Sequence, residues 1–435
     1  MRPPLCARSV RNWGFSVQGL TTANWQRRHL PMPETSGGIV AASRDTGSQK
    51  ALRERNTQLV ISTLGVDGPQ TQAALARRTG LSTGTVSNIV RELASRGRIT
   101  TDRVISAGRR SVEVTLVPDG RVVVGVDVGR SHLRVMGMNT ARTPFGMRSV
   151  ALPDSHRPAD TLPLARRMID EMLDEFGCER SKVTLCGLAF PASLDPVTGA
   201  VVQASVLAEW AGLNLIEATT SAFALPVILE NDANLGALAH AGSGRFADAH
   251  CLVYLKVGTG IGAGLALDGR LYESISGISG EIGHSQVVDG GDVCTCGNRG
   301  CLETVASTRR IVADLAYIRP GRHVDLAEVI AAARASEPAV LRLLHDAGVV
   351  IGRALAPICN LLSPDVVVLG GALAPVGAPL LEGLVQSARQ RSLATATAHT
   401  QFALSDLADD AEVHGACLLA LRRVLTEGDD LVSNR

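Results

Sequence analysis

The sequence predicts an α/β protein in which a larger body follows a small helical unit. Apolar residues recur at helical spacing between positions 56 and 97, and a strand-like alternation follows them up to position 118. Beyond that point, short apolar runs alternate with amphipathic stretches, which is typical of α/β domains. A third signal is the Gly-rich stretch 277–303, whose one histidine and three cysteines indicate a structural metal site.

The composition is that of a globular protein, with 45% hydrophobic and 20% charged residues. No apolar run approaches the ~18 residues that a membrane helix needs, so no membrane partner is expected. The nine cysteines are odd in number and mostly isolated, which favours a reduced, cytoplasmic compartment. Residues 1–118 contain 17 Lys and Arg against 7 Asp and Glu, whereas the remainder contains 26 against 35. A basic head on an acidic body favours a nucleic-acid module joined to another domain.

Residues 1–50 are predicted to be a disordered, Arg-rich extension, because six arginines accompany two acidic residues without sustained periodicity. Three other interpretations stay open at this point. The segment could be a transit peptide, an arm that adds phosphate contacts, or sequence upstream of the true start. The apolar core of a secretory signal is missing from it.

Residues 51–118 are predicted to form a winged helix-turn-helix. Three helical patterns follow one another: 56–64, 72–79 and 83–97. Gly80 provides a turn between the second and third patterns, and Ser82 is placed to cap the third helix. The inward face of that helix would consist of Val86, Ile89, Val90 and Leu93.

The outward face of the third helix is polar, as a recognition helix in the major groove requires. It would present Thr83, Thr85, Ser87, Asn88 and Arg91. The following residues alternate like two strands around Gly108, and Arg109 and Arg110 could reach phosphates or the minor groove from that wing. The alternative is a helical interaction module with a solvated basic face. Three signals favour DNA binding over this alternative: the glycine in the turn, the polar face of the third helix and the arginines of the wing.

Polar or Gly-rich segments follow several predicted strands of the body, which spans residues 119–435. Asp127 and Gly129 end the first strand, and four glycines lie in 258–264. The backbone at such positions can approach a bound phosphate, although many ordinary hairpins have the same sequence pattern. Asp232 lies at a strand-to-helix junction, where it could act as a general base or merely cap the helix through Asn234.

The stretch 277–303 places four metal-binding side chains on one Gly-rich loop. They are His284, Cys294, Cys296 and Cys301. Such ligands suit a closed tetrahedral zinc site, although C-x-C-x4-C is not a common zinc-finger spacing and a chance cluster of loop cysteines is the alternative. Because Glu281 and Glu303 lie beside these ligands, a polyol pocket braced by the metal is expected.

The chain from about Arg53 onward resembles the ROK family (repressor, open reading frame, kinase), chiefly through GISGEIGH and CTCGNRGCLE. The resemblance implies a two-lobed, actin-like sugar-kinase (ribonuclease H-like) fold over 119–435, with the C-terminal helix returning to the first lobe. It implies zinc at His284, Cys294, Cys296 and Cys301. It implies sugar contacts at Asn231, Asp232, Glu281, His284 and Glu303. The family's phosphate loops correspond to Asp127, Gly129, Gly258, Thr259, Gly260 and Gly262.

Departures from the kinases of that family favour its regulators. The kinases carry Asp-x-Gly-Gly-Thr at the first loop, whereas Arg130 here adds bulk where the backbone must approach ATP. They also lack an N-terminal helix-turn-helix. The resemblance therefore implies a cytoplasmic transcriptional regulator, in the first place a repressor of carbohydrate genes. It would bind a double-stranded DNA operator as a homodimer or homotetramer, with a sugar as effector.

Two other functions stay open. The chain could be an ATP-dependent sugar kinase with Asp232 as catalytic base, in which case ATP joins the structural zinc as a cofactor. It could instead be a repressor whose partner is a transporter subunit rather than a sugar.

Overall fold

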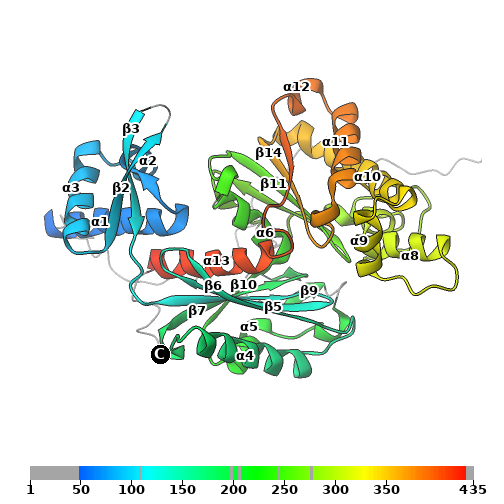
Figure 1. The fold of residues 1–435 in the computed structure, drawn as a ribbon, viewed down its shortest axis with the longest axis horizontal. Helices are drawn as coiled ribbons and strands as arrows, with labels where there is room; N and C mark the ends of the chain where they lie inside the picture. Colours follow the sequence, from blue (N-terminus) through cyan, green and yellow to red (C-terminus); the bar gives the residue numbers. More distant parts are fainter. Residues whose placement is uncertain are drawn as a thin grey trace, which may run out of the picture. The chain divides into compact units, whose positions relative to one another are not determined.

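The computed structural model describes residues 49–106, 109–195, 199–203, 207–242, 244–274 and 278–427. The predicted extension 1–50 lies outside these described residues, except for Gln49 and Lys50. Figure 1 shows a helical head unit and two lobes, each built around a β-sheet. Among the described helices, none combines the length and apolar character that crossing a bilayer requires.

The head unit is the predicted winged helix-turn-helix. Its elements are α1 (Gln49–Asp67), β1 (Gln70–Thr71), α2 (Gln72–Thr79), α3 (Thr83–Ser95), β2 (Ile99–Ser106) and β3 (Arg109–Leu116). Gly80 ends α2 with a φ of 69°, which favours glycine, and the Ser82 side chain accepts a hydrogen bond from the Thr85 N–H at 3.1 Å. The predicted inward face is confirmed, since Val86, Ile89, Val90 and Leu93 are buried.

The first lobe has a five-stranded sheet in the order β10-β7-β4-β5-β6. Its strands are β4 (Val122–Val128), β5 (His132–Asn139), β6 (Pro144–Ala151), β7 (Val183–Phe190) and β10 (Val227–Asn231). The helices α4 (Pro158–Glu175) and α5 (Leu215–Phe223) pack on one face, where Trp210 is fully buried. The C-terminal helix α13 (Ala411–Glu427) packs on the other face, which agrees with the expected return to the first lobe.

The second lobe has a sheet in the order β13-β12-β11-β14-β15. Its strands are β11 (Cys251–Val257), β12 (Ile261–Leu267), β13 (Arg270–Leu271), β14 (Val366–Gly370) and β15 (Gln401–Leu404). One face of the sheet packs on helices including α10 (Pro338–Leu362) and α11 (Ala378–Arg391). The other face packs on α6 (Asp232–Ala241).

The two sheets follow the same plan. In each, three antiparallel strands lead to two further strands that run parallel to the first. This repeat of topology confirms the predicted sugar-kinase-like fold class. The sequence patterns did not predict β15, which follows β14 in the chain and pairs with it. Four residues are too few to show a periodicity.

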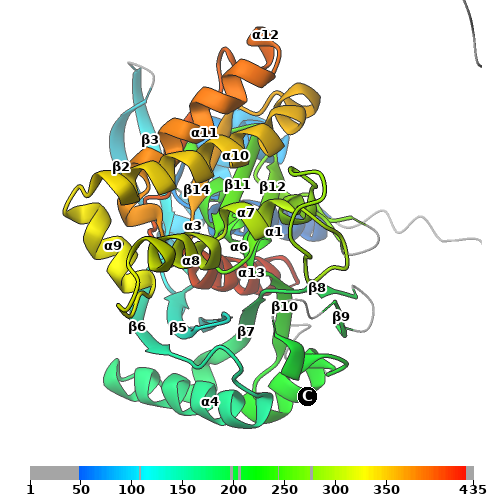
Figure 2. The same ribbon diagram turned by 90° about the vertical axis from the view of Figure 1, so that its right-hand side faces the viewer.

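The helices α6 and α13 lie between the two sheets (Figure 2). Glycines let their backbones approach closely. A Cβ atom added to Gly415 of α13 would lie 2.0 Å from the Leu235 carbonyl oxygen of α6. One added to Gly187 of β7 would lie 2.0 Å from the Ala416 carbonyl oxygen. Backbone contacts therefore hold α13 against the first sheet and against α6.

Candidate functional site

One cavity brings together all five residues predicted to contact a sugar. It is lined by Asn231, Asp232, Glu281, His284 and Glu303. Its wall also includes part of the predicted phosphate-loop set, namely Gly129, Gly258, Thr259, Gly260 and Gly262. Asp127 belongs to the same predicted set but is fully buried next to the cavity, where it contacts His132 of the wall.

Asp232 is the first residue of α6, and both of its carboxylate oxygens have partners. Oδ1 accepts a hydrogen bond from the Ala233 N–H at 2.8 Å, and Oδ2 accepts one from Lys256 Nζ at 2.7 Å. The residue that caps α6 is Asn231, whose side chain accepts from the N–H groups of Ala233 and Asn234. The alternative in which Asp232 merely caps the helix is therefore wrong.

Lys256 occupies a central position that the sequence patterns did not predict. Its Nζ lies 3.7 Å from Oε1 of Glu412, and that oxygen also accepts a hydrogen bond from the Tyr254 hydroxyl at 3.0 Å. Burial opposes the charge on Lys256, but Asp232 and Glu412 outweigh burial and raise its pKa. Burial raises the pKa of Glu412 to about 7, and the attraction of Lys256 offsets part of this effect. A lone lysine within the apolar run of β11, in a chain with three lysines, was the available signal.

Two basic side chains contact one of the two carboxylate oxygens of Asp127. His132 Nε2 lies 2.8 Å and Arg134 Nη1 lies 3.2 Å from its Oδ2. Burial would raise the pKa of this carboxyl group, but its interactions with His132, Lys256 and Arg134 hold that pKa well below its usual range. Arg134 also pairs with Asp409.

Arg130, which lies in the same predicted phosphate region, also forms an ion pair, because its Nε lies 3.5 Å from Asp154. The described cations around this part of the cavity are thus paired with carboxylates of the chain. Packing accounts for one of the predicted glycines. Gly262 lies inside β12, where an added Cβ atom would meet the Ala233 side chain of α6 at 3.2 Å.

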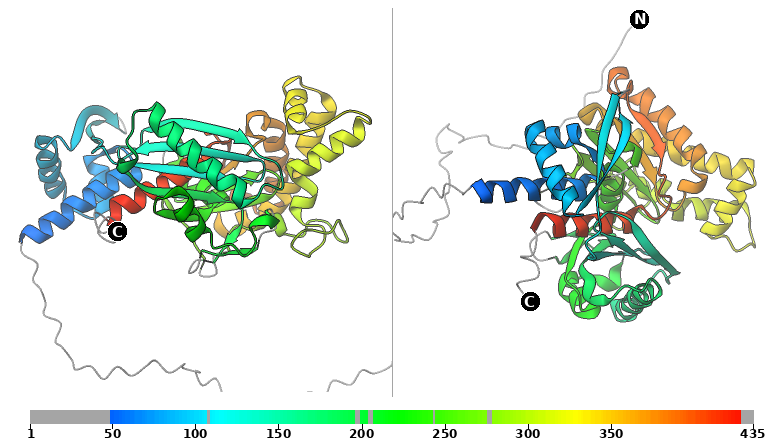
Figure 3. Two further views of the ribbon diagram at one scale, coloured as in Figure 1. Left: turned by 90° about the horizontal axis from the view of Figure 1, so that it is seen from below. Right: turned by 60° about the vertical axis from the view of Figure 1, so that its left-hand side comes forward.

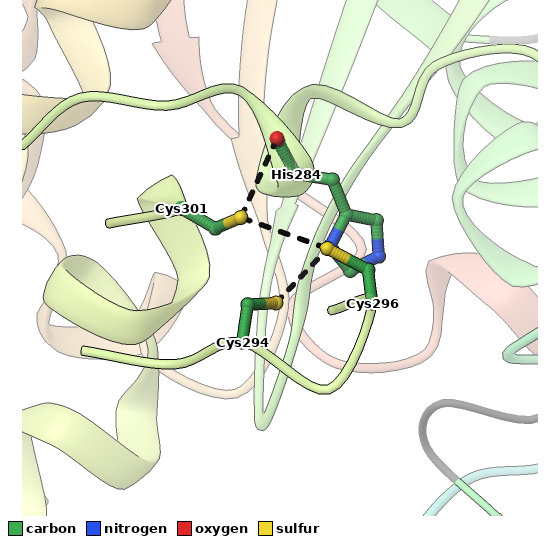
Figure 4. Close-up of side chains that lie close together, drawn as sticks. All are labelled: His284, Cys294, Cys296 and Cys301. Carbon is green, nitrogen blue, oxygen red and sulfur yellow. Dashed lines mark hydrogen bonds between the residues drawn. The ribbon is translucent and has the colours of Figure 1, made fainter. Parts of the chain in front are cut away.

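The four predicted metal ligands form a compact cluster in which their ligand atoms all lie within 4.8 Å of one another (Figure 4). The Sγ atoms of Cys296 and Cys301 are 3.7 Å apart, and Cys294 Sγ lies 3.5 Å from His284 Nδ1. Two thiolates bound at ~2.3 Å in a tetrahedron would be about 3.8 Å apart. The cluster could therefore hold a metal ion.

His284 joins this cluster to the cavity. Its Nδ1 faces the cysteines, while its Nε2 lies 3.7 Å from Oε2 of Glu281. Glu281 in turn accepts a hydrogen bond from the Ser193 hydroxyl of the first lobe at 2.8 Å. The pocket thus receives side chains from both lobes.

The predicted DNA-contacting residues lie on α3 and on the wing. Thr83, Asn88 and Arg91 are exposed, whereas Thr85 and Ser87 are half-buried. Arg91 donates a hydrogen bond from Nη1 to the Asn88 side chain at 3.2 Å. Arg110 is exposed in β3; Arg109 starts that strand, but its side chain falls outside the described part of the structure.

Comparison with known proteins agrees with this architecture. The sequence profile of the ROK family matches residues 123–423, and a profile described as winged helix-turn-helix DNA-binding matches residues 53–100. The putative xylose repressor of Caldicellulosiruptor sp. (strain Rt8B.4) is 26% identical over 397 residues, which cover 88% of this chain and 99% of the repressor. The glucokinase of Halalkalibacterium halodurans is 29% identical over 310 residues, which cover 68% of this chain and 93% of the glucokinase.

A solved structure supports the same relation. The crystal structure of a ROK family transcriptional regulator, a homolog of the Escherichia coli MLC protein, aligns with a TM-score of 0.68 and 26% identity. The alignment covers 88% of this chain and 98% of that regulator. The two regulators therefore match more of the chain than the glucokinase does, and the resemblance predicted from the sequence is confirmed.

Proposed function

Because the chain belongs to the ROK family and carries a winged helix-turn-helix, we propose that it is a DNA-binding transcriptional repressor of carbohydrate genes. A sugar or sugar derivative bound in the cavity of the ROK domain would act as its effector. The proposal assigns residues 51–118 to operator binding and residues 119–435 to effector binding. It further assigns the protein to the cytoplasm as a homodimer or homotetramer, since two operator half-sites call for two-fold symmetry.

The observation that carries this proposal is the contrast between the two halves of the cavity. The sugar-binding half presents acceptors suited to hydroxyl groups, namely Asn231, Asp232, Glu281, His284 and Glu303. The half that corresponds to the phosphate loops has its described cations paired with carboxylates of the chain. Such a cavity suits a neutral polyol better than a nucleotide triphosphate. The relative named as a putative xylose repressor supports a sugar of this class.

The proposal includes structural zinc at His284, Cys294, Cys296 and Cys301. Three sulfur ligands and one imidazole suit zinc better than a hard cation such as magnesium. The ion would fix the orientation of the His284 ring through Nδ1, so that Nε2 stays directed toward Glu281. Zinc would thereby set the shape of the sugar pocket without taking part in chemistry.

A sugar kinase is the second candidate, favoured by the glucokinase match and by the presence of Asp232 in the cavity. A general base must accept a proton from the attacking hydroxyl group. Both oxygens of the Asp232 carboxylate already accept hydrogen bonds, from the Ala233 N–H at 2.8 Å and from the Lys256 ammonium group at 2.7 Å. Arg130 additionally lies in the wall where ATP phosphates would approach.

Operator binding by the purified chain tests the proposal. We expect salt-sensitive binding to DNA from upstream of its own gene, and release by one of D-xylose, D-glucose or N-acetylglucosamine. Arg91→Ala should weaken operator binding by about 5- to 150-fold, since a base contact contributes ~1–3 kcal/mol. Asp232→Asn should weaken the response to sugar, because the cavity loses one of its carboxylates.

ATP turnover with the same sugars is the control measurement. Sugar-dependent ATP turnover that disappears in Asp232→Asn, together with a lack of specific DNA binding, would make the kinase the better account. Operator binding that no sugar changes would favour a regulator that senses a protein partner instead.

A further inference from the structure

We propose that α13 is the element that transmits sugar binding to the DNA-binding head, through Lys256 and Glu412 at one end and Leu425 at the other. This inference rests on the proposed function and specifies how that function is regulated. It makes Lys256, Glu412 and Gln58 positioning residues of the response.

At the cavity, this connection begins with the ammonium group of Lys256, which contacts two carboxylates. It lies 2.7 Å from Asp232, a residue of the cavity wall, and 3.7 Å from Glu412, the second residue of α13. Oε2 of Glu412 is buried and has no hydrogen-bond partner among the described residues. A buried acceptor left in this state is unfavourable, so Glu412 competes with Asp232 for the same ammonium group.

A bound sugar changes that competition. A hydroxyl group that donates a hydrogen bond to Asp232 satisfies part of its charge and weakens the hold of Asp232 on Lys256. The ammonium group can then move toward Glu412. The first turn of α13 is thereby drawn toward β11, the strand that carries Lys256.

The middle of α13 packs closely enough against its neighbours to transmit such a displacement. Its backbone meets α6 at Gly415 and the first sheet at Gly125 and Gly187. An added Cβ atom at Gly125 would lie 2.5 Å from the Val413 carbonyl oxygen. Since backbone meets backbone at these points, no flexible side chain lies between them to absorb a displacement. An α-helix rises 1.5 Å per residue, so Glu412 and Leu425 are about 20 Å apart along the axis.

The far end of α13 contacts the DNA-binding head. Figure 3 shows α1 and α13 side by side in both views. Gln58 Nε2 of α1 donates a hydrogen bond to the Leu425 carbonyl oxygen at 3.0 Å. The Leu425 side chain lies against Gly65, where a Cβ atom would meet it at 1.9 Å. A displacement of the last turn of α13 must therefore move α1 or break this contact.

The first experiment needs neither sugar nor DNA. Amide hydrogen exchange of residues 56–66 is compared between the full-length parent chain and the variants Asp232→Asn and Glu412→Gln. Asp232→Asn releases Lys256 toward Glu412, as a bound sugar would, so we expect exchange in this part of α1 to become at least threefold faster. Glu412→Gln removes the carboxylate that pulls α13, so exchange should change less in that variant. Glu281→Gln is the matched control, because Glu281 lies in the same cavity but contacts Ser193 and His284 rather than α13.

The second experiment measures coupling between sugar and DNA. It compares the Kd for upstream DNA with and without D-xylose, D-glucose or N-acetylglucosamine; the ratio is the coupling factor, typically about 5- to 150-fold. Gln58→Ala should keep sugar affinity within about threefold while the coupling factor falls below about 3. Arg78→Ala is its control, because the Arg78–Asp248 pair at 3.4 Å joins the head to the body without α13.

The outcomes separate this inference from the proposed function. If the parent chain binds no DNA, or if no sugar changes its DNA affinity, the proposed function fails, and the exchange experiment still decides whether α13 connects the two sites. Unchanged exchange in Asp232→Asn overturns the inference. An equal rise in Glu281→Gln also overturns it, because the effect would then be general loosening. A sugar response retained by Gln58→Ala contradicts the DNA end of the connection.

Discussion

Cys296 is the proposed metal ligand best suited to test the zinc assignment. It is half-exposed, whereas Cys294 and Cys301 are buried, so its replacement disturbs packing least. Cys296→Ser removes one thiolate from a four-ligand site. We expect zinc content to fall from about one ion per chain to a small fraction of that. Because His284 would lose its fixed orientation, sugar affinity should also fall by about 10- to 100-fold.

Metal analysis and titration calorimetry check this prediction together. Cys251→Ser is the matched control, since Cys251 is also half-exposed but lies outside the cluster. A zinc-free Cys296→Ser chain that binds its sugar as the parent does would show that the metal does not shape the pocket. Full zinc content in that variant would contradict the ligand assignment itself.

At the scale of single elements, the glycine in α13 is required by packing. Gly415→Ala would place a methyl group 2.0 Å from the Leu235 carbonyl oxygen, so α6 and α13 must separate. We expect the free energy of unfolding to fall by roughly 1–3 kcal/mol, as for other overpacked cores. Chemical denaturation followed by circular dichroism measures the change.

Gly84→Ala is the matched substitution, and it is expected to raise the free energy of unfolding rather than lower it. Gly84 also lies within a helix, but an added Cβ atom would meet its nearest neighbour, Ser82 Oγ, at an ordinary 3.9 Å. Replacing a helical glycine by alanine in open space should stabilise the chain by about 0.5–1 kcal/mol. A destabilisation of similar size in both variants would mean that close packing at Gly415 is not the cause.

The elements that the sequence predicted are those with local signals. Gly80 marks the end of α2 and Ser82 marks the start of α3, and both signals lie next to the helices that they limit. The head unit could therefore be derived from the sequence pattern alone. The four predicted metal ligands likewise lie on one short stretch of chain. The Lys256 cluster could not be found in this way, because Tyr254 and its partner Glu412 are 158 residues apart. Contacts of that kind depend on the fold, which places α13 between the two sheets.

At the scale of the whole molecule, charge is distributed between two tasks. Residues 1–118 carry 17 basic against 7 acidic side chains, which suits binding to a polyanion. The proposed connection from sugar pocket to head instead uses contacts of buried or part-buried groups around Lys256 and Leu425. Salt screens exposed charges strongly and buried pairs much less. The two tasks should therefore respond differently to ionic strength.

We expect operator affinity to fall steeply with salt while the coupling factor between sugar and operator stays nearly constant. Between 50 and 200 mM salt, a protein with several phosphate contacts loses orders of magnitude in affinity. The ratio of Kd values with and without sugar should change less than about twofold over that range, because Asp232 and Glu412 are buried and Lys256 is part-buried between them. Fluorescence anisotropy with labelled operator DNA measures both quantities in one titration series. A coupling factor that decreases along with affinity would place the connection at exposed charges instead, for which the Arg78–Asp248 pair is the candidate, since Asp248 is fully exposed.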